Sequence, residues 1–203
     1  MKVLLVGGAR PNFMKITPLY RESLKYNEVC CKIVHTGQHY DYEMSQAFFE
    51  DLELPEPDFF LNSGSGTHAV QTAKIMTAFE ELCQDERPDL VIVVGDVNST
   101  LACSVVAKKL LINVAHVEAG LRSFDLTMPD EINRIVTDSI ADYFFMTEES
   151  GAKNLVREGR PKDKIHFVGN VMIDNLFHQA RKLRKDDGSP PLGLKKKRRI
   201  MFF

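Results

Sequence analysis

Short apolar runs alternate with longer segments of helical periodicity through most of the chain. The apolar runs are rich in Val, Ile and Leu, which is the pattern of strands that are buried on both faces of a parallel sheet. This alternation predicts an α/β fold with a doubly wound parallel sheet and helices on both faces. The expected strands are residues 3–6, 32–36, 90–95, 115–117, 143–146 and 165–168.

Capping and turn residues mark the helices that connect these strands. Asn98 and Thr147 are residue types that cap helix N-termini. Pro18 is expected in the first turn of one helix, and Pro129 suits the first position of another. The expected helices are residues 15–26, 67–84, 98 to about 111, one that starts at 129, and 147 to near 159.

The character of the sequence changes near Arg184. Residues 185–191 are typical of a polar linker, residues 195–199 form a basic run, and residues 200–203 resemble a strand that has just begun. We therefore expect residues 1–183 to form a Rossmann-like lobe that ends in a linking helix. Residues 184–203 are expected to be a linker and the truncated or divergent start of a second lobe.

Composition argues against several classes of protein. The chain has 203 residues, with 26 basic and 28 acidic side chains, and so lacks the basic excess of a nucleic-acid binder. Its apolar runs fall well short of the ~20 residues that cross a membrane. The four cysteines show neither CxxC spacing nor a paired framework, so no metal site or disulfide is expected. These features favour a cytoplasmic globular protein.

A glycine-rich turn follows the first expected strand. Glycines at 7 and 8 would let the backbone approach a ligand, the following helix N-terminus offers N–H groups to an anion, and Arg10 and Lys15 add positive charge. An ordinary tight turn explains the same pattern. Neither a GxGxxG fingerprint nor a Walker A motif occurs, and the GxGxxA match at 64–69 lacks a strong strand before it.

Three carboxylates also follow expected strands or open a helix. Asp96 closes one strand, Glu118 closes another, and Glu131 lies in the first turn of a helix. Because the carboxyl ends of parallel strands meet at one edge, we expect these groups to gather there with the cations Arg10, Lys15 and Arg122. Such clusters shift pKa values and are typical of acid–base sites. Alone, Asp96 is also explained as a helix cap, and Glu131 is better explained as a partner of the helix dipole.

The chain contains seven motifs in a fixed order. They are GARPxxxK at 8–15, TGQH at 36–39, GDVNST at 95–100, HVEAGLR at 116–122, PDEINR at 129–134, TEES at 147–150 and GNVMID at 169–174. Together they resemble the non-hydrolysing UDP-N-acetylglucosamine 2-epimerases over about residues 1–183. Asn12 stands where that family often has Glu, and the tail from 195 departs from the family pattern.

The resemblance implies the N-terminal lobe of a two-lobed GT-B architecture. It also implies a nucleotide-sugar substrate, UDP-N-acetylglucosamine (UDP-GlcNAc) or UDP-N-acetylmannosamine (UDP-ManNAc), with no cofactor or metal, a homodimer when complete, and a role in polysaccharide biosynthesis. By resemblance, the catalytic residues are Asp96, Glu118 and Glu131, the substrate-binding residues are Arg10 and Lys15, and a possible activator site holds Gln38, His39 and Gln71.

The chemistry that the resemblance implies is an elimination. The proton on C2 of the sugar is not beside a carbonyl and is not acidic, so the family eliminates UDP across C1–C2 to give 2-acetamidoglucal and then adds UDP back. This needs a base near C2, help for the departing diphosphate, and stabilisation of an oxocarbenium-like C1. The sequence leaves open which carboxylate takes the proton. Since the second lobe supplies most contacts to the nucleotide, the chain alone is expected to be inactive.

Three other interpretations remain open on the sequence. A GT-B glycosyltransferase lobe would also place a strand-end acid in a cleft. A hydrolysing epimerase would share much of this lobe but release free N-acetylmannosamine. The divergent tail favours a third interpretation, in which the chain is a non-catalytic fragment that binds a sugar nucleotide.

Overall fold

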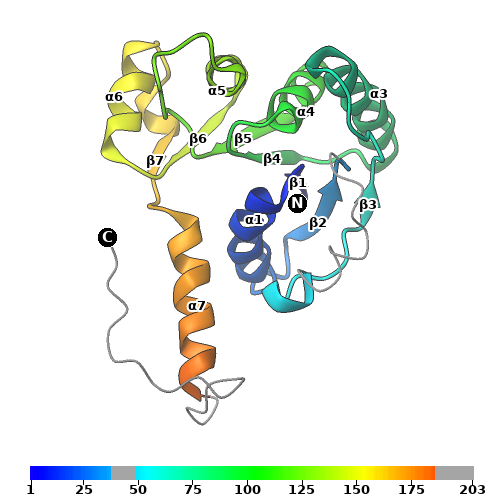
Figure 1. Ribbon diagram of the computed structural model, residues 1–203, viewed down its shortest axis with the longest axis vertical. Helices are drawn as coiled ribbons and strands as arrows, with labels where there is room; N and C mark the ends of the chain where they lie inside the picture. Colours follow the sequence, from blue (N-terminus) through cyan, green and yellow to red (C-terminus); the bar gives the residue numbers. More distant parts are fainter. Residues whose placement is uncertain (38–48, 186–203) are drawn as a thin grey trace.

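The computed structural model describes residues 1–37 and 49–185, and its centre is one parallel sheet (Figure 1). Seven strands lie in the order β3-β2-β1-β4-β5-β6-β7, and every neighbouring pair is parallel. The predicted doubly wound α/β fold is confirmed. The strands are β1 (Lys2–Gly7), β2 (Cys30–His35), β3 (Phe59–Phe60), β4 (Leu90–Val94), β5 (Asn113–Val117), β6 (Tyr143–Met146) and β7 (Ile165–Phe167).

Helices cover both faces of the sheet. The helices that lie wholly within the described residues are α1 (Arg10–Ser23), α3 (His68–Glu86), α4 (Asn98–Lys109), α5 (Pro129–Ile140), α6 (Glu149–Arg157), the 3-10 turn η1 (Lys162–Lys164) and α7 (Val171–Lys185). On one face, α3 and α4 pack on Leu4 and Val6 of β1. On the other face, α1 packs on Leu5, and α7 lies beside α1. The strands are therefore apolar at successive positions because both faces are buried.

Several expected boundaries differ from those observed. The strand β3 has only two residues and was not expected. Helix α1 starts at Arg10 rather than at 15, because Pro11 occupies its first turn, where the missing N–H costs nothing. Pro18 consequently lies inside α1 and not in its first turn. The expected domain boundary at 183/184 remains an expectation, since residues 186–203 lie outside the described part of the chain.

The two expected helix caps are also wrong. Val97 and Glu148 occupy the N-cap positions of α4 and α6, and neither helix has a side-chain cap. Asn98 is instead the first residue of α4, and its amide donates to Gln71 Oε1 at 2.8 Å. Its side chain is therefore used between helices rather than for capping. Within the described residues, no helix has both the length and the apolar character needed to cross a membrane.

A glycine contact joins the segment after β5 to the start of α6. Gly120 has φ +80°, and a Cβ at this position would lie 2.5 Å from the carbonyl oxygen of Gly151. Only a residue without a side chain allows the two backbones to approach this closely. The contact fixes α6 against the loop that begins with Glu118.

We expect Gly120→Ala to destabilise the chain more than Gly159→Ala does. Gly159 has the same φ of +80°, but a Cβ there would have nothing within 4 Å. Gly159→Ala should therefore cost only the left-handed backbone term of about 1–2 kcal/mol. The steric overlap should add about 1–3 kcal/mol at Gly120. Urea unfolding monitored by circular dichroism measures both values, and equal values would contradict the close contact.

Candidate functional site

The register between β4 and β5 brings two carboxylates to the same edge of the sheet. Val93 pairs with His116 and Val94 pairs with Val117, so both strands end at the same level. Asp96 follows β4 by two residues and Glu118 follows β5 directly. The expectation that these residues share the carboxyl edge is confirmed.

Glu118 is held in a strained backbone conformation beside Lys15. Its φ is +72°, a left-handed value that costs a residue with a side chain on the order of 1–3 kcal/mol. Its N–H donates to the carbonyl of Phe145 at 2.9 Å, and Lys15 Nζ lies 2.5 Å from Glu118 Oε2. Both side chains are 13% exposed. This ion pair therefore lies at the surface of the edge, within reach of a ligand.

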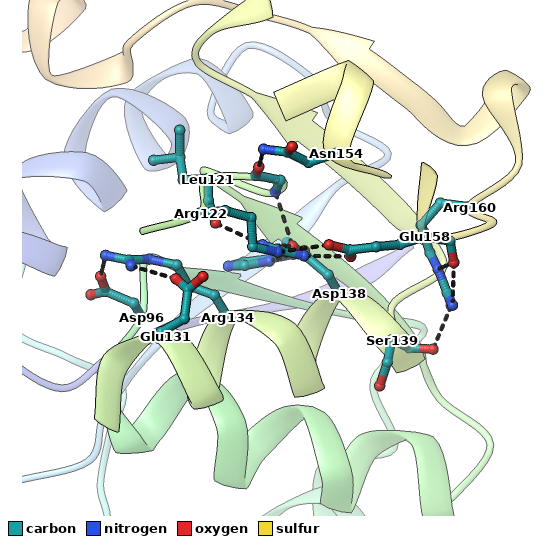
Figure 2. Close-up of polar contacts among 12 residues, drawn as sticks. Asp96, Leu121, Arg122, Glu131, Arg134, Asp138, Ser139, Asn154, Glu158 and Arg160 are labelled. Carbon is teal, nitrogen blue, oxygen red and sulfur yellow. Dashed lines mark hydrogen bonds and ion pairs between the residues drawn. The ribbon is translucent and has the colours of Figure 1, made fainter. Parts of the chain in front are cut away.

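Arg134 connects the other two carboxylates (Figure 2). Its Nη2 donates to Asp96, and its Nη1 lies 3.1 Å from Glu131 Oε2. The side chain of Asp96 is 31% exposed, whereas that of Glu131 is 1% exposed. The three expected carboxylates are thus brought to one region, but only Asp96 and Glu118 reach solvent.

The oxygens of Glu131 are occupied by the loop that follows β5. Oε2 accepts the Ser123 N–H and Oε1 accepts the Phe124 N–H, each at 3.0 Å. Burial raises the pKa of Glu131, but these two N–H groups and Arg134 more than offset it, so the pKa is lowered. Glu131 is therefore a buried carboxylate that binds the loop at Ser123 and Phe124. This role is additional to any interaction with the helix dipole.

The glycine-rich turn is braced from within the protein. Asn12 Oδ1 accepts the N–H groups of Gly8 at 3.3 Å and of Ala9 at 2.9 Å, and its Nδ2 donates to the carbonyl of Val94 at 3.0 Å. The N–H groups of Gly8 and Ala9, just before α1, are therefore occupied within the protein. A glutamate at position 12 could accept from the same N–H groups but could not donate to Val94. Arg10, the first residue of α1, is exposed at the surface.

A chain of amides runs from Gln71 to the backbone of Asp96. Gln71 accepts from Asn98, whose Oδ1 accepts from Asn133 Nδ2 at 3.3 Å. Asn133 Nδ2 also donates to the Asp96 carbonyl at 2.9 Å. Of the expected activator residues, only Gln71 is described. Gln38 and His39 lie outside the described residues.

The sequence reasoning missed a buried polar network behind this edge. Its centre is Asp138 on α5, which contacts His116 at 2.6 Å, and Arg122 lies 2.8 Å from Asp138. Arg122 also pairs with Glu158 at 2.6 Å (Figure 2). Arg122 was expected among the open cations of the edge, but its side chain is 1% exposed. Glu131 and Asp138 are seven residues apart and so share one face of α5, but this spacing alone does not show that the face is buried.

Two cavities lie in different parts of the lobe. A cavity of about 410 Å³ adjoins Arg134 and lies between the loop after β5 and the start of α6, where Ser123, Ser150 and Lys153 also line it. A second cavity of about 590 Å³ lies between α1 and α7. None of the three carboxylates lines either cavity. The described residues include no group of three or more His, Cys, Asp or Glu side chains that could hold a metal ion. The edge therefore offers paired carboxylates and cations, which suit proton transfer and anion binding.

We expect Glu131→Gln to destabilise the 203-residue chain by about 1–3 kcal/mol at pH 7, because the new amide leaves a buried N–H without an acceptor. Asp130→Asn is the matched control. Asp130 lies in the same first turn but is exposed, so its loss should cost about 0.3–1 kcal/mol. Urea unfolding measures both. Equal costs would mean that Glu131 is only a partner of the helix dipole.

The loss of unfolding free energy caused by Glu131→Gln should depend on pH in a defined direction. Because the folded pKa of Glu131 is lowered, its stabilisation is complete above the unfolded pKa of about 4.3 and is lost as the pH falls through the folded pKa. The gap in unfolding free energy between the parent chain and Glu131→Gln should therefore shrink below about pH 4. A gap that does not change from pH 7 to pH 3 would contradict this assignment.

Comparisons with known proteins agree on one family. A family model described as UDP-N-acetylglucosamine 2-epimerase matches residues 22–202. A Methanocaldococcus jannaschii protein named UDP-N-acetylglucosamine 2-epimerase is 46% identical over 187 residues, which are 92% of this chain and 51% of that protein. A Pseudomonas aeruginosa protein named UDP-2,3-diacetamido-2,3-dideoxy-D-glucuronate 2-epimerase is 42% identical over 196 residues, which are 96% of this chain and 54% of that protein.

A solved structure agrees with these sequence matches. The crystal structure of Methanocaldococcus jannaschii UDP-GlcNAc 2-epimerase in complex with UDP-GlcNAc and UDP has a TM-score of 0.86 and 45% identity to this chain. The match covers 93% of this chain and 52% of that one. The chain thus spans about half the length of the curated relatives it matches. By the family model and these relatives, the chain belongs to the UDP-N-acetylglucosamine 2-epimerase family.

Proposed function

We propose that this chain is one lobe of an enzyme that interconverts UDP-GlcNAc and UDP-ManNAc. The reaction eliminates UDP to form 2-acetamidoglucal and then adds UDP to the other face. The observation that carries the proposal is the meeting of Asp96 and Glu118 at one sheet edge, each paired with a cation from another element. The names of the relatives support the same substrate class.

The proposed roles follow from exposure and pairing. Asp96 and Glu118 reach solvent, so one of them removes the C2 proton and the other faces the developing positive charge at C1. Glu131 belongs to the proposed catalytic group, but its oxygens already bind Arg134 and the loop amides. In this proposal it acts by holding Arg134 against Asp96.

The proposed cations serve the diphosphate. Arg10 opens α1, and Lys15 lies further along the same helix against Glu118. A diphosphate at this edge would compete with Glu118 for Lys15, which would leave Glu118 free to act as a base. The activator site around Gln38, His39 and Gln71 and a homodimeric state are carried over from the family resemblance. Neither the reaction nor these sites call for a cofactor.

A second candidate substrate has specific support. The Pseudomonas aeruginosa relative is named for a diacetamido uronic acid sugar nucleotide and is 42% identical to this chain. Epimerisation at C2 by elimination demands the same carboxylates for either sugar, since both lose a C2 proton and a UDP leaving group. Assays with both nucleotide sugars, followed by NMR of the products, therefore test the reaction and its substrate together. Release of a free 2-acetamido sugar would favour a hydrolysing enzyme instead.

We expect Asp96→Asn and Glu118→Gln to lower kcat by about 10²-fold or more in a full-length protein that carries this lobe. Glu131→Gln is expected to lower kcat as well, in proportion to the displacement of Arg134. KM should change less, because the loss falls on the transition state. Incubation in ²H₂O gives a second readout. Deuterium should enter C2 in the parent and enter more slowly in the variants, whereas unchanged exchange would mean that the site is misplaced.

We expect the 203 residues alone to show little or no turnover. In a two-lobed enzyme, the second lobe supplies much of the nucleotide binding and the closure that excludes water. NMR of UDP-GlcNAc incubated with the chain, beside a full-length relative as positive control, measures this. Turnover near that of the relative would contradict a need for the second lobe.

A further inference from the structure

His116 lies in β5 and is completely buried, together with Asp138 of α5. Its Nδ1 is 2.6 Å from Asp138 Oδ1, and its Nε2 is 2.8 Å from the carbonyl oxygen of Gly95. The opposite oxygen of Asp138 accepts the Gly120 N–H at 2.9 Å and lies 2.8 Å from Arg122. Both ring nitrogens of His116 and both carboxylate oxygens of Asp138 therefore have polar partners.

These partners determine where the protons lie. A backbone carbonyl only accepts, so Nε2 must carry a proton toward Gly95. Oδ2 of Asp138 accepts from Gly120 and lies beside the Arg122 cation, and both partners favour the ionised carboxylate. A carboxylate at Oδ1 in turn favours a proton on Nδ1, so the network favours a doubly protonated, cationic imidazole.

The surrounding charges agree with this assignment. Burial lowers the pKa of His116, but Asp138, the Gly95 carbonyl and Glu118 more than offset it, so the pKa is raised. Burial likewise raises the pKa of Asp138, and His116, Arg122 and Gly120 more than offset it, so that pKa is lowered.

The hydrogen bonds of His116 and Asp138 reach the segments that follow β4 and β5, where the candidate site lies. Gly95 immediately precedes Asp96, and Gly120 follows Glu118 by two residues. The His116–Asp138 pair therefore connects the backbone just before Asp96 to the backbone just after Glu118. The ends of β4 and β5 are also joined directly by the Gly95 N–H, which donates to the carbonyl of Val117 at 3.0 Å. Among the backbone hydrogen bonds of the described residues outside helices and strands, no other joins these two segments.

We propose that His116 and Asp138 are positioning residues that fix the separation of Asp96 and Glu118 through Gly95 and Gly120. Neither side chain is exposed, so neither touches the substrate. The inference deepens the proposed function and rests on it for its effect on turnover. The placement itself is a property of the 203-residue chain and is measured there.

The test compares Asp138→Asn with Glu158→Gln. Asparagine keeps the shape of Asp138 and an acceptor for Gly120, but it removes the charge that keeps His116 doubly protonated. Glu158→Gln alters the same network at its far end, where Glu158 contacts Arg122 and is 30% exposed. It changes no bond of His116, Gly95 or Gly120 and so serves as the matched control.

The first readout is NMR of the ¹⁵N-labelled 203-residue chain at pH 7. The parent and Glu158→Gln should show both His116 ring nitrogens protonated, and Asp138→Asn should show one. The amide resonances of Asp96 and Glu118 should move in Asp138→Asn and stay in place in Glu158→Gln. A singly protonated His116 in the parent, or unmoved amides in Asp138→Asn, overturns the proposal whether or not the protein is an epimerase.

The second readout is kinetic, in a full-length protein that carries this lobe. Asp138→Asn should lower kcat by about 10–100-fold, the scale of a small displacement of catalytic groups, with KM within about 3-fold of the parent. Glu158→Gln should stay within about 3-fold in both. Equal losses in the two variants would mean a purely structural network. If Asp138→Asn does not fold, His116→Gln keeps a donor for Gly95 without the charge, and the Asp96 and Glu118 amide resonances and the kinetics are measured in it, with the same expected results.

Discussion

The parallel register between β4 and β5 is the constraint on which the carboxyl edge depends. Apart from Asn113 and His116, both strands carry only apolar side chains, so apolar burial alone would tolerate a slip between them. His116 removes that tolerance. A slip by one residue would turn His116 to the opposite face of the sheet and separate its ring from the buried carboxyl group of Asp138. The cost of burying unpaired charges therefore specifies the register, and the register determines where Asp96 and Glu118 emerge.

Charge pairing divides the edge into an outer and an inner layer. In the outer layer, Lys15 partners Glu118, and Arg134 partners Asp96, with their side chains partly exposed. In the inner layer, Glu131, His116 and Asp138 are completely buried, and all of their polar atoms face donors or acceptors. Buried ion pairs contribute little net stability, but breaking one is costly. The apolar layers therefore supply most of the stability of the lobe, and the ion pairs specify the arrangement of its carboxyl edge.

The sequence was sufficient for the fold class because buried parallel strands are continuous apolar runs. It was insufficient for β3, which has two residues and no periodicity to detect. The capping role expected for Asn98 was wrong because its amide bonds Gln71 instead. Asp138 was missed because an acid on an amphipathic helix resembles a surface residue until its partner on β5 is known. The strain at Glu118 depends on the whole edge and leaves no local signal in the sequence.

The most direct test of the account follows one oxygen atom. UDP-GlcNAc carrying ¹⁸O in the bridge between C1 and the β-phosphorus is incubated with a full-length protein that carries this lobe, and the recovered substrate is examined by ³¹P NMR. Elimination frees that oxygen as part of the UDP phosphate, so the account predicts that ¹⁸O moves into the non-bridging positions. Asp96→Asn and Glu118→Gln should suppress this movement. Epimerisation with all of the ¹⁸O still in the bridge would contradict the elimination that the edge is proposed to perform.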